Sequence, residues 1–82
     1  MPYIKQEDRA KMDKVVEAMV EAGIQANGDL NYILFKYCKY HIPRNYNSIK
    51  NFNGELAETA TEIRRKILAR YEDIKESENG MI

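Results

Sequence analysis

The residues best suited to chemistry are the basic side chains of Arg64, Arg65, Lys66 and Arg70, which Tyr71 follows directly. A guanidinium group binds phosphate through two parallel hydrogen bonds, and a tyrosine ring stacks on a nucleobase. Together these residue types suit a nucleotide or a short nucleic acid. The alternative is that Arg64 and Arg65 pair with acids of another helix or project into water, as surface charges usually do.

Further polar residues complete the ligand-binding site that we predict. Asn31 and Tyr32 end the segment Gly-Asp-Leu-Asn-Tyr, and Glu72 and Asp73 follow Tyr71. The tyrosines would stack on the ligand, whereas the two carboxylates would hold the arginines or accept hydrogen bonds from sugar hydroxyls. The predicted site consists of Asn31, Tyr32, Arg64, Arg65, Arg70, Tyr71 and Asp73.

Catalytic and metal signatures are weak. Cys38 and His41 are three positions apart and could form a nucleophilic pair, but no orienting group or oxyanion donor accompanies them. We therefore interpret both as core residues. Glu55, Glu58 and Glu62 fall on neighbouring turns but lack an associated histidine, which favours a solvated acidic face over a metal site. We expect no enzymatic activity, no metal and no cofactor.

The elements that must position these residues are helices, because apolar residues recur at steps of three and four and no strand-type alternation appears. Gly23 is the expected C-cap of the first helix, the turn Asn27-Gly28-Asp29 precedes the second, and Asn45 or Asn47 can cap the third. We predict an all-α single domain over residues 1–82, with helices at about 6–22, 29–40 and 48–76 and a tail at 77–82.

The third predicted helix is the longest, at about 28 residues or roughly 42 Å. One apolar stripe follows it, made of Ile49, Phe52, Leu56, Ala60, Ile63, Ile67 and Ile74. Arg70 lies on the same stripe, where it would pair with Asp73 or face an interface groove. Gly54 inside the helix is costly, and close approach of another helix would compensate for it. We expect this helix to be used in oligomerisation.

Charge is balanced overall but segregated along the chain. Lys plus Arg and Asp plus Glu each number 13, which argues weakly against a dedicated duplex DNA binder. Residues 64–70 carry four cations and no anion, whereas residues 71–82 carry four anions and one lysine. An antiparallel pairing of two long helices would set residues 71–78 of one copy against residues 64–70 or 36–50 of the other.

Cys38 is the only cysteine, which excludes an intrachain disulfide and fits a reducing compartment. No segment approaches the roughly 20 apolar residues that a membrane span needs. The start of the chain lacks a signal pattern. We therefore expect a soluble cytoplasmic protein without a membrane partner.

Several short segments together resemble a family of short phage-associated proteins of unknown function. They are Met1-Pro2-Tyr3-Ile4, Gln6-Glu7-Asp8-Arg9, Gly28-Asp29-Leu30-Asn31-Tyr32, Arg64-Arg65-Lys66, Tyr71-Glu72-Asp73-Ile74-Lys75 and Asn79-Gly80. The chain departs from the family pattern at Lys5, where a capping threonine is frequent, at Arg70, where proline is frequent, and at Met81, where an acid is. The resemblance implies a viral origin, the cytoplasm of an infected host cell and a compact helical fold, but no activity.

Our first hypothesis is therefore a small, non-catalytic, homo-oligomeric protein that binds and neutralises a host protein or a small phosphate-bearing signal. The second is a nucleic-acid-associated regulator that uses residues 36–50 and 64–70, against which the zero net charge counts. The third is a structural assembly protein in which the long helix forms a multimer and has no further role.

Overall fold

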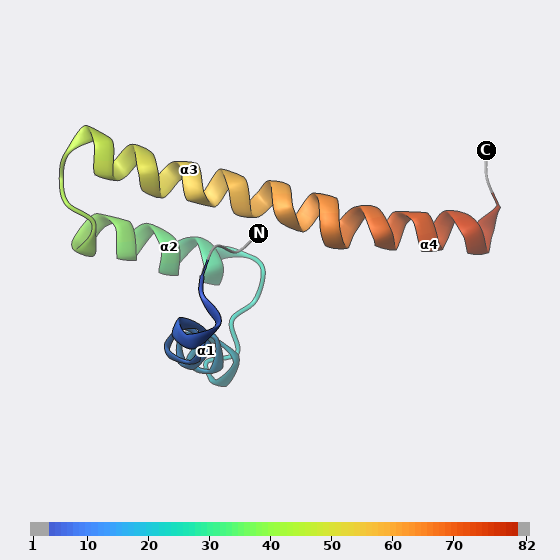
Figure 1. The fold of residues 1–82 in the computed structure, drawn as a ribbon, viewed down its shortest axis with the longest axis horizontal. Helices are drawn as coiled ribbons and strands as arrows, with labels where there is room; N and C mark the ends of the chain where they lie inside the picture. The colour runs from blue at the N-terminus through green and yellow to red at the C-terminus, as the bar shows by residue number, and fades with distance from the viewer. Residues whose placement is uncertain (1–3, 81–82) are drawn as a thin grey trace. The chain divides into compact units, whose positions relative to one another are not determined.

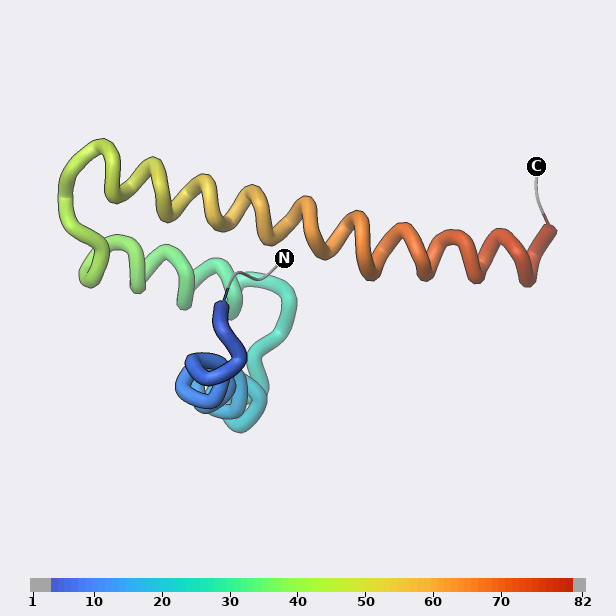
Figure 2. Tube along the Cα trace, in the orientation of Figure 1, coloured from blue at the N-terminus to red at the C-terminus, as the bar shows by residue number. Residues whose placement is uncertain are grey.

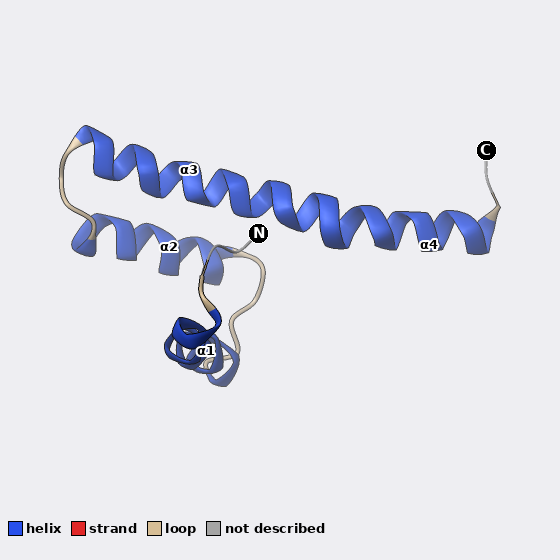
Figure 3. Ribbon diagram, viewed as in Figure 1, coloured by secondary structure: helices blue, strands red, loops and turns tan. Residues whose placement is uncertain are grey.

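The computed structural model describes residues 4–80, so the Met1-Pro2-Tyr3 opening and Met81 lie outside the described residues. The elements are α1 (Gln6–Glu21), α2 (Gly28–His41), α3 (Tyr46–Ile63), the π-helix η1 (Arg64–Leu68) and α4 (Ala69–Asn79). The described part of the chain contains helices and loops and no strand (Figure 3). The prediction of an all-α chain with a long C-terminal helix is confirmed.

The chain divides into two units, Met1–His41 and Ile42–Ile82. The first holds α1 and α2, and the second holds α3, η1 and α4. The prediction of a single domain over residues 1–82 stays a prediction.

The first helix begins without a side-chain cap. Lys5 occupies the N-cap position in an extended conformation, and its side chain makes no capping hydrogen bond. Its carbonyl still accepts from the N–H of Asp8, at 2.9 Å. Glu7 and Asp8 place negative charge in the first turn, where the helix dipole favours it.

The first helix ends in a Schellman motif. Gly23 has a φ of +67°, which glycine adopts without the steric cost that a Cβ would bring. Its N–H donates to the carbonyl of Val20 at 3.0 Å, and the N–H of Ile24 donates to the carbonyl of Met19 at 3.2 Å. These two bonds define the motif, and an apolar contact between its flanking residues commonly accompanies it. The predicted C-cap role of Gly23 is confirmed.

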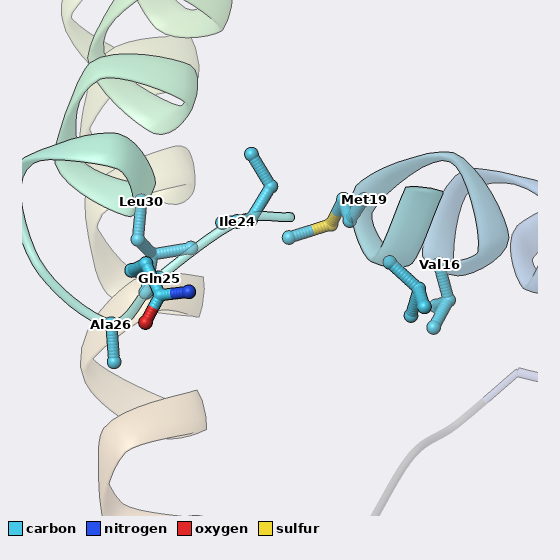
Figure 4. Close-up of a pocket in the computed structure, with 7 residues that line it drawn as sticks. Val16, Met19, Ile24, Gln25, Ala26 and Leu30 are labelled. Carbon is cyan, nitrogen blue, oxygen red and sulfur yellow. The ribbon is translucent and has the colours of Figure 1, made fainter. Parts of the chain in front are cut away.

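An open apolar groove of about 390 Å³ lies beside this motif. Figure 4 shows Met19 and Ile24 extending toward one another, with Val16 further along α1 and Leu30 on α2. The groove is lined by Val16, Met19, Val20, Ile24, Gln25, Ala26 and Leu30. The Schellman turn thus places side chains of α1 and of the following loop around one hollow.

Two side chains fix the start of α2. The Asn27 Oδ1 atom accepts from the backbone N–H of Asp29 at 2.9 Å, and the Asp29 carboxylate accepts from the N–H of Gln25 at 3.2 Å. Asn27 therefore caps the helix, which begins at Gly28, one residue before the predicted start. The helix ends at His41, shortly before Pro43, whose ring cannot continue it.

The second unit is dominated by one uninterrupted helical run, which the tube in Figure 2 follows from α3 to the end of α4. Asn45 caps it: its Oδ1 atom accepts from the N–H of Ser48 at 2.9 Å. Between the two predicted cap candidates, Asn45 is thus the one used. The run spans residues 46–79, about 50 Å, rather than the predicted 48–76. Ser77 and Glu78 belong to the helix and not to a tail, and Gly80 ends it with a positive φ.

The run changes its hydrogen-bond pattern at residues 64–68. The N–H of Ala69 donates to the carbonyl of Arg64, five residues earlier, as a π-helix requires. Upstream, Thr59 and Thr61 donate their hydroxyls to the carbonyls of Glu55 and Ala57, at 2.8 and 3.1 Å. Such back-bonding perturbs the α-helical ladder. The colour gradient of Figure 1 shows that the rod nevertheless continues without a break.

No side chain among the described residues is fully buried. Phe52 and Leu56 on α3 are half-buried, whereas the large apolar side chains further along the helix are exposed: Ile63, Ile67, Leu68, Tyr71 and Ile74. Within the described residues, nothing lies within 4 Å of the position that a Cβ on Gly54 would take. The described residues of the second unit therefore do not supply the close helix approach expected at Gly54.

Candidate anion-binding segment

The predicted site residues fall in both units. Asn31 and Tyr32 lie on α2. The other five lie on the long helix: Arg64 and Arg65 in η1, and Arg70, Tyr71 and Asp73 in α4.

Glu62 orients part of the basic segment, which we define as residues 64–70. Its carboxylate lies 3.2 Å from the Nζ atom of Lys66 and 3.5 Å from a terminal nitrogen of Arg65. These are pairs one turn apart on the same helix, with the acid on the N-terminal side, which is the favourable order. The alternative that we considered for Arg65, pairing with an acid, is thus realised, but by its own helix.

Arg64 and Arg70 differ from these two residues. Both are exposed, and neither makes an ion pair or side-chain hydrogen bond with another described residue. The pairing of Arg70 with Asp73 that we considered is not formed among the described contacts. Two guanidinium groups therefore remain available to an external anion.

The π-helix changes which residues share a face. An i→i+5 turn contains about one residue more than an α-turn. Side chains after it are therefore rotated back around the helix axis by about one residue, which corresponds to about 100°. Tyr71, rather than Arg70, then follows Ile63 and Ile67 on the apolar stripe, and Arg70 moves to its flank. The expectation that Arg70 lies in the middle of the stripe assumed a continuous α-helix, which the π-helix at Arg64–Leu68 interrupts.

Tyr71 is contacted by Lys75, which lies one turn further along the helix. The Lys75 Nζ atom lies 5.7 Å from the centre of the Tyr71 ring and 3.2 Å from a carboxylate oxygen of Glu78. A cation over an aromatic face is attracted by the ring quadrupole. Tyr71 nevertheless stays 57% exposed, so its outer face is free to stack on a ligand.

The same tyrosine–lysine spacing recurs elsewhere and was missed from the sequence. Lys36 lies 5.3 Å from the Tyr32 ring centre, and Lys50 lies 5.8 Å from that of Tyr46. Each lysine follows its tyrosine by four residues, a spacing that places both on one helix face. The repeated four-residue spacing in the sequence is the signal that could have revealed these pairs.

On α2, the predicted pair of site residues has different surroundings. The Lys36 Nζ atom donates to the Tyr32 hydroxyl at 3.1 Å, so the ammonium group of Lys36 lies next to Tyr32. The backbone N–H of Asn31 donates to the carbonyl of Asn27 at 3.3 Å, while its side chain is exposed. Tyr32 and Lys36 therefore form a small cationic aromatic patch, and Asn31 lies next to Tyr32 in sequence.

The remaining chemical candidates gain little support. Cys38 is half-buried, and the His41 ring lies 5.5 Å from that of Tyr37. Among residues 4–80, no three acidic, cysteine or histidine side chains are grouped so as to hold a metal ion.

A second open groove, of about 340 Å³, lies at the start of α3 and includes Pro43, Phe52 and Glu55 but none of the predicted site residues. None of the described helices combines the length and the apolar character that crossing a bilayer requires.

The geometry thus supplies two exposed guanidinium groups, two cations oriented by Glu62 and one exposed aromatic ring within about two turns of helix. Such groups can bind phosphate oxygens and stack on a planar group. No general base or nucleophile accompanies them in the basic segment.

Comparison with known proteins gives one match. The whole chain, residues 1–82, matches the family described as "Domain of unknown function (DUF6899)". Neither the curated proteins nor the solved structures yield a match.

Proposed function

Because the chain belongs to this family, whose description assigns no activity, we propose from the site itself that the protein is a small, non-catalytic binding protein for a phosphate-bearing ligand. The observation that carries the proposal is the contrast within the basic segment. Glu62 compensates Arg65 and Lys66, whereas Arg64 and Arg70 have no described acidic partner. An anion bound there would complete the charge balance of the segment.

Tyr71 gives the ligand a second chemical feature. Its exposed ring directly follows Arg70, and aromatic stacking together with phosphate contacts is how proteins hold nucleotides and short single strands. We therefore propose a nucleotide-like ligand rather than a bare inorganic anion.

The biological part of the proposal is sequestration. We propose that the protein is a homo-oligomer in the cytoplasm of an infected host cell, where it binds and neutralises a signal or a host protein. The resemblance to phage-associated proteins supports the viral origin. The exposed apolar residues of the long helix support the oligomer, since exposed apolar surface of this kind marks interaction sites.

The test is ligand binding by the full chain. Native mass spectrometry of protein purified from its host would reveal a retained small molecule, and titration calorimetry would use ADP and inorganic pyrophosphate as probes. Replacing Arg64 and Arg65 together by alanine should weaken ADP binding by about tenfold or more, because each lost hydrogen bond to a charged group is worth about 1.5–3 kcal/mol.

The matched control replaces Lys11 and Lys14 of α1 by alanine, which removes the same charge from exposed positions outside the basic segment. If the double variant Arg64→Ala and Arg65→Ala binds ADP and every retained ligand as tightly as the original chain does, this site is refuted.

A nucleic-acid role has one observation in its favour, the tyrosine–lysine pairs on α2 and α3. Stacking and charge combine there as they do in proteins that bind single strands. Binding to a single-stranded oligonucleotide that weakens steeply with salt would favour this alternative, and no binding at low salt would eliminate it.

A further inference from the structure

The apolar stripe of the distal long helix is not covered by the described residues of its own unit. Ile63, Ile67, Tyr71 and Ile74 are 50, 65, 57 and 56% exposed. The substantial contacts of η1 are with α3 and α4, the segments that continue the same helix on either side. A helix with an uncovered apolar stripe gains stability when another surface removes that stripe from water.

The charges beside this stripe determine which surface fits. The basic segment holds four cations over residues 64–70, and residues 71–78 hold four anions and one lysine. A parallel second copy would set cations against cations. An antiparallel second copy would set the basic segment of each chain against the acidic stretch of the other, and such self-complementarity is what a two-fold interface requires.

We propose that two copies of this chain pair antiparallel through residues 63–78, with the two-fold axis close to Arg70 and Tyr71. The axis position follows from the charges, because the middle of the basic segment lies near Ile67 and the middle of the acidic stretch lies near Ile74. Ile67 of one copy then lies opposite Ile74 of the other. Arg70 lies across the axis from Tyr71 of the second copy, where a guanidinium can stack on the ring.

The π-helix fits this pairing because it keeps the stripe apolar through the axis. With Tyr71 on the stripe and Arg70 on its flank, the guanidinium of Arg70 lies at the edge of the helix contact and not in its middle. The pairing deepens the homo-oligomer of the proposed function and rests on that part of it. The pairing covers Arg70 and Tyr71, so in the dimer the anion of the proposed function would be bound by Arg64 and Arg65, which lie near the ends of the paired region.

The first experiment measures the mass of the purified full chain by sedimentation at micromolar concentration. We expect twice the mass of one chain. Replacing Glu72 and Glu76 by lysine should weaken self-association by at least about tenfold, because it makes both halves of the interface basic. The control replaces Glu55 and Glu58 by lysine, which changes the net charge equally but lies outside residues 63–78. A monomer at all concentrations, or equal weakening by the control, would overturn the pairing.

The second experiment determines the orientation and the register. In a Cys38→Ser background, chains carrying Ile67→Cys are mixed with chains of different mass carrying Ile74→Cys and are oxidised mildly. The antiparallel pairing predicts mainly the mixed disulfide, since a disulfide needs Cα atoms within about 7 Å. Disulfides of each variant mainly with itself would show a parallel pair and overturn the proposal, as would a dimer that forms no mixed disulfide.

The two proposals can fail separately. A dimer that binds neither ADP nor pyrophosphate would refute the ligand but leave the pairing intact. A monomer that binds ADP through Arg64 and Arg65 would refute the pairing and keep the anion site.

Discussion

The carboxylate of Glu62 lies 3.2 Å from the ammonium of Lys66, across the point where α3 passes into the π-helix. The same carboxylate contacts Arg65, so one acid partly neutralises two cations of the basic segment. An anionic ligand must therefore compete with Glu62 for Arg65 and Lys66, but not for Arg64.

Removing the Glu62 charge should strengthen anion binding. Glu62→Gln releases Arg65 and Lys66, and we expect the affinity for ADP to rise by up to about fivefold at low salt, since one exposed unit charge at contact is worth about 1 kcal/mol. Titration calorimetry would measure the change. Glu58→Gln is the control, because it alters the net charge equally on an exposed residue of the preceding turn. An equal gain in both variants would point to net charge and not to the Glu62 pairs.

The Schellman turn after α1 should depend on Gly23. Gly23→Ala forces a Cβ into the left-handed region, at a cost of about 1–2 kcal/mol in the free energy of unfolding. Urea unfolding followed by circular dichroism would measure it. Gly28→Ala is the control, since Gly28 has no positive φ and open space around it; we expect no loss there. Equal effects of the two substitutions would contradict the assigned turn.

The long helix should depend on Asn45 as its cap. Asn45→Ala removes the acceptor for the Ser48 N–H, and we expect a loss of about 1 kcal/mol in stability together with fraying of the first turn of α3. Amide hydrogen exchange at Ser48 and Ile49 would report the fraying. Asn47→Ala, inside the first turn, should be nearly neutral or slightly stabilising. A larger effect at Asn47 would mean that the cap is misassigned.

The start of α1 can be improved, because Lys5 supplies no capping acceptor. Lys5→Ser should raise the helix stability by about 1 kcal/mol, since a serine hydroxyl at the N-cap accepts from a backbone N–H of the first turn. Thermal unfolding monitored by circular dichroism would detect the gain. Lys14→Ser, at an exposed position inside the same helix, should instead destabilise it slightly because serine is the poorer helix former. A loss at Lys5 would show that its aliphatic stem matters more than capping.

Gly54 should be replaceable at no cost. Gly54→Ala meets open space and removes backbone freedom from the unfolded chain, so we expect a gain of about 0.5–1 kcal/mol. Its self-association should stay unchanged, because residue 54 lies outside the proposed paired region. Sedimentation and urea unfolding on the same sample would check both. Weaker association of Gly54→Ala would instead place Gly54 in a close contact between copies.

The helices and most of their ends could be predicted from the sequence because their causes are local. Gly23 ends α1, and Asn45 begins α3, through bonds to residues at most a few positions away. The end of the long helix was less predictable. Ser77 and Glu78 look like a polar tail, yet a helix already in progress gains a hydrogen bond with each added residue until Gly80 leaves the helical region.

The sequence by itself determined the helical class, the caps, the segregated charges and the presence of an apolar stripe, because each follows from residue type and short spacing. Only the tertiary structure decided the phase of that stripe beyond Ile63. An i→i+5 turn at Arg64–Leu68 places Tyr71 where an unbroken α-helix would place Arg70. The choice between the two hydrogen-bond patterns leaves no mark in residue spacing, since the same residues can form either turn, and back-bonding by nearby threonines can shift the balance between them.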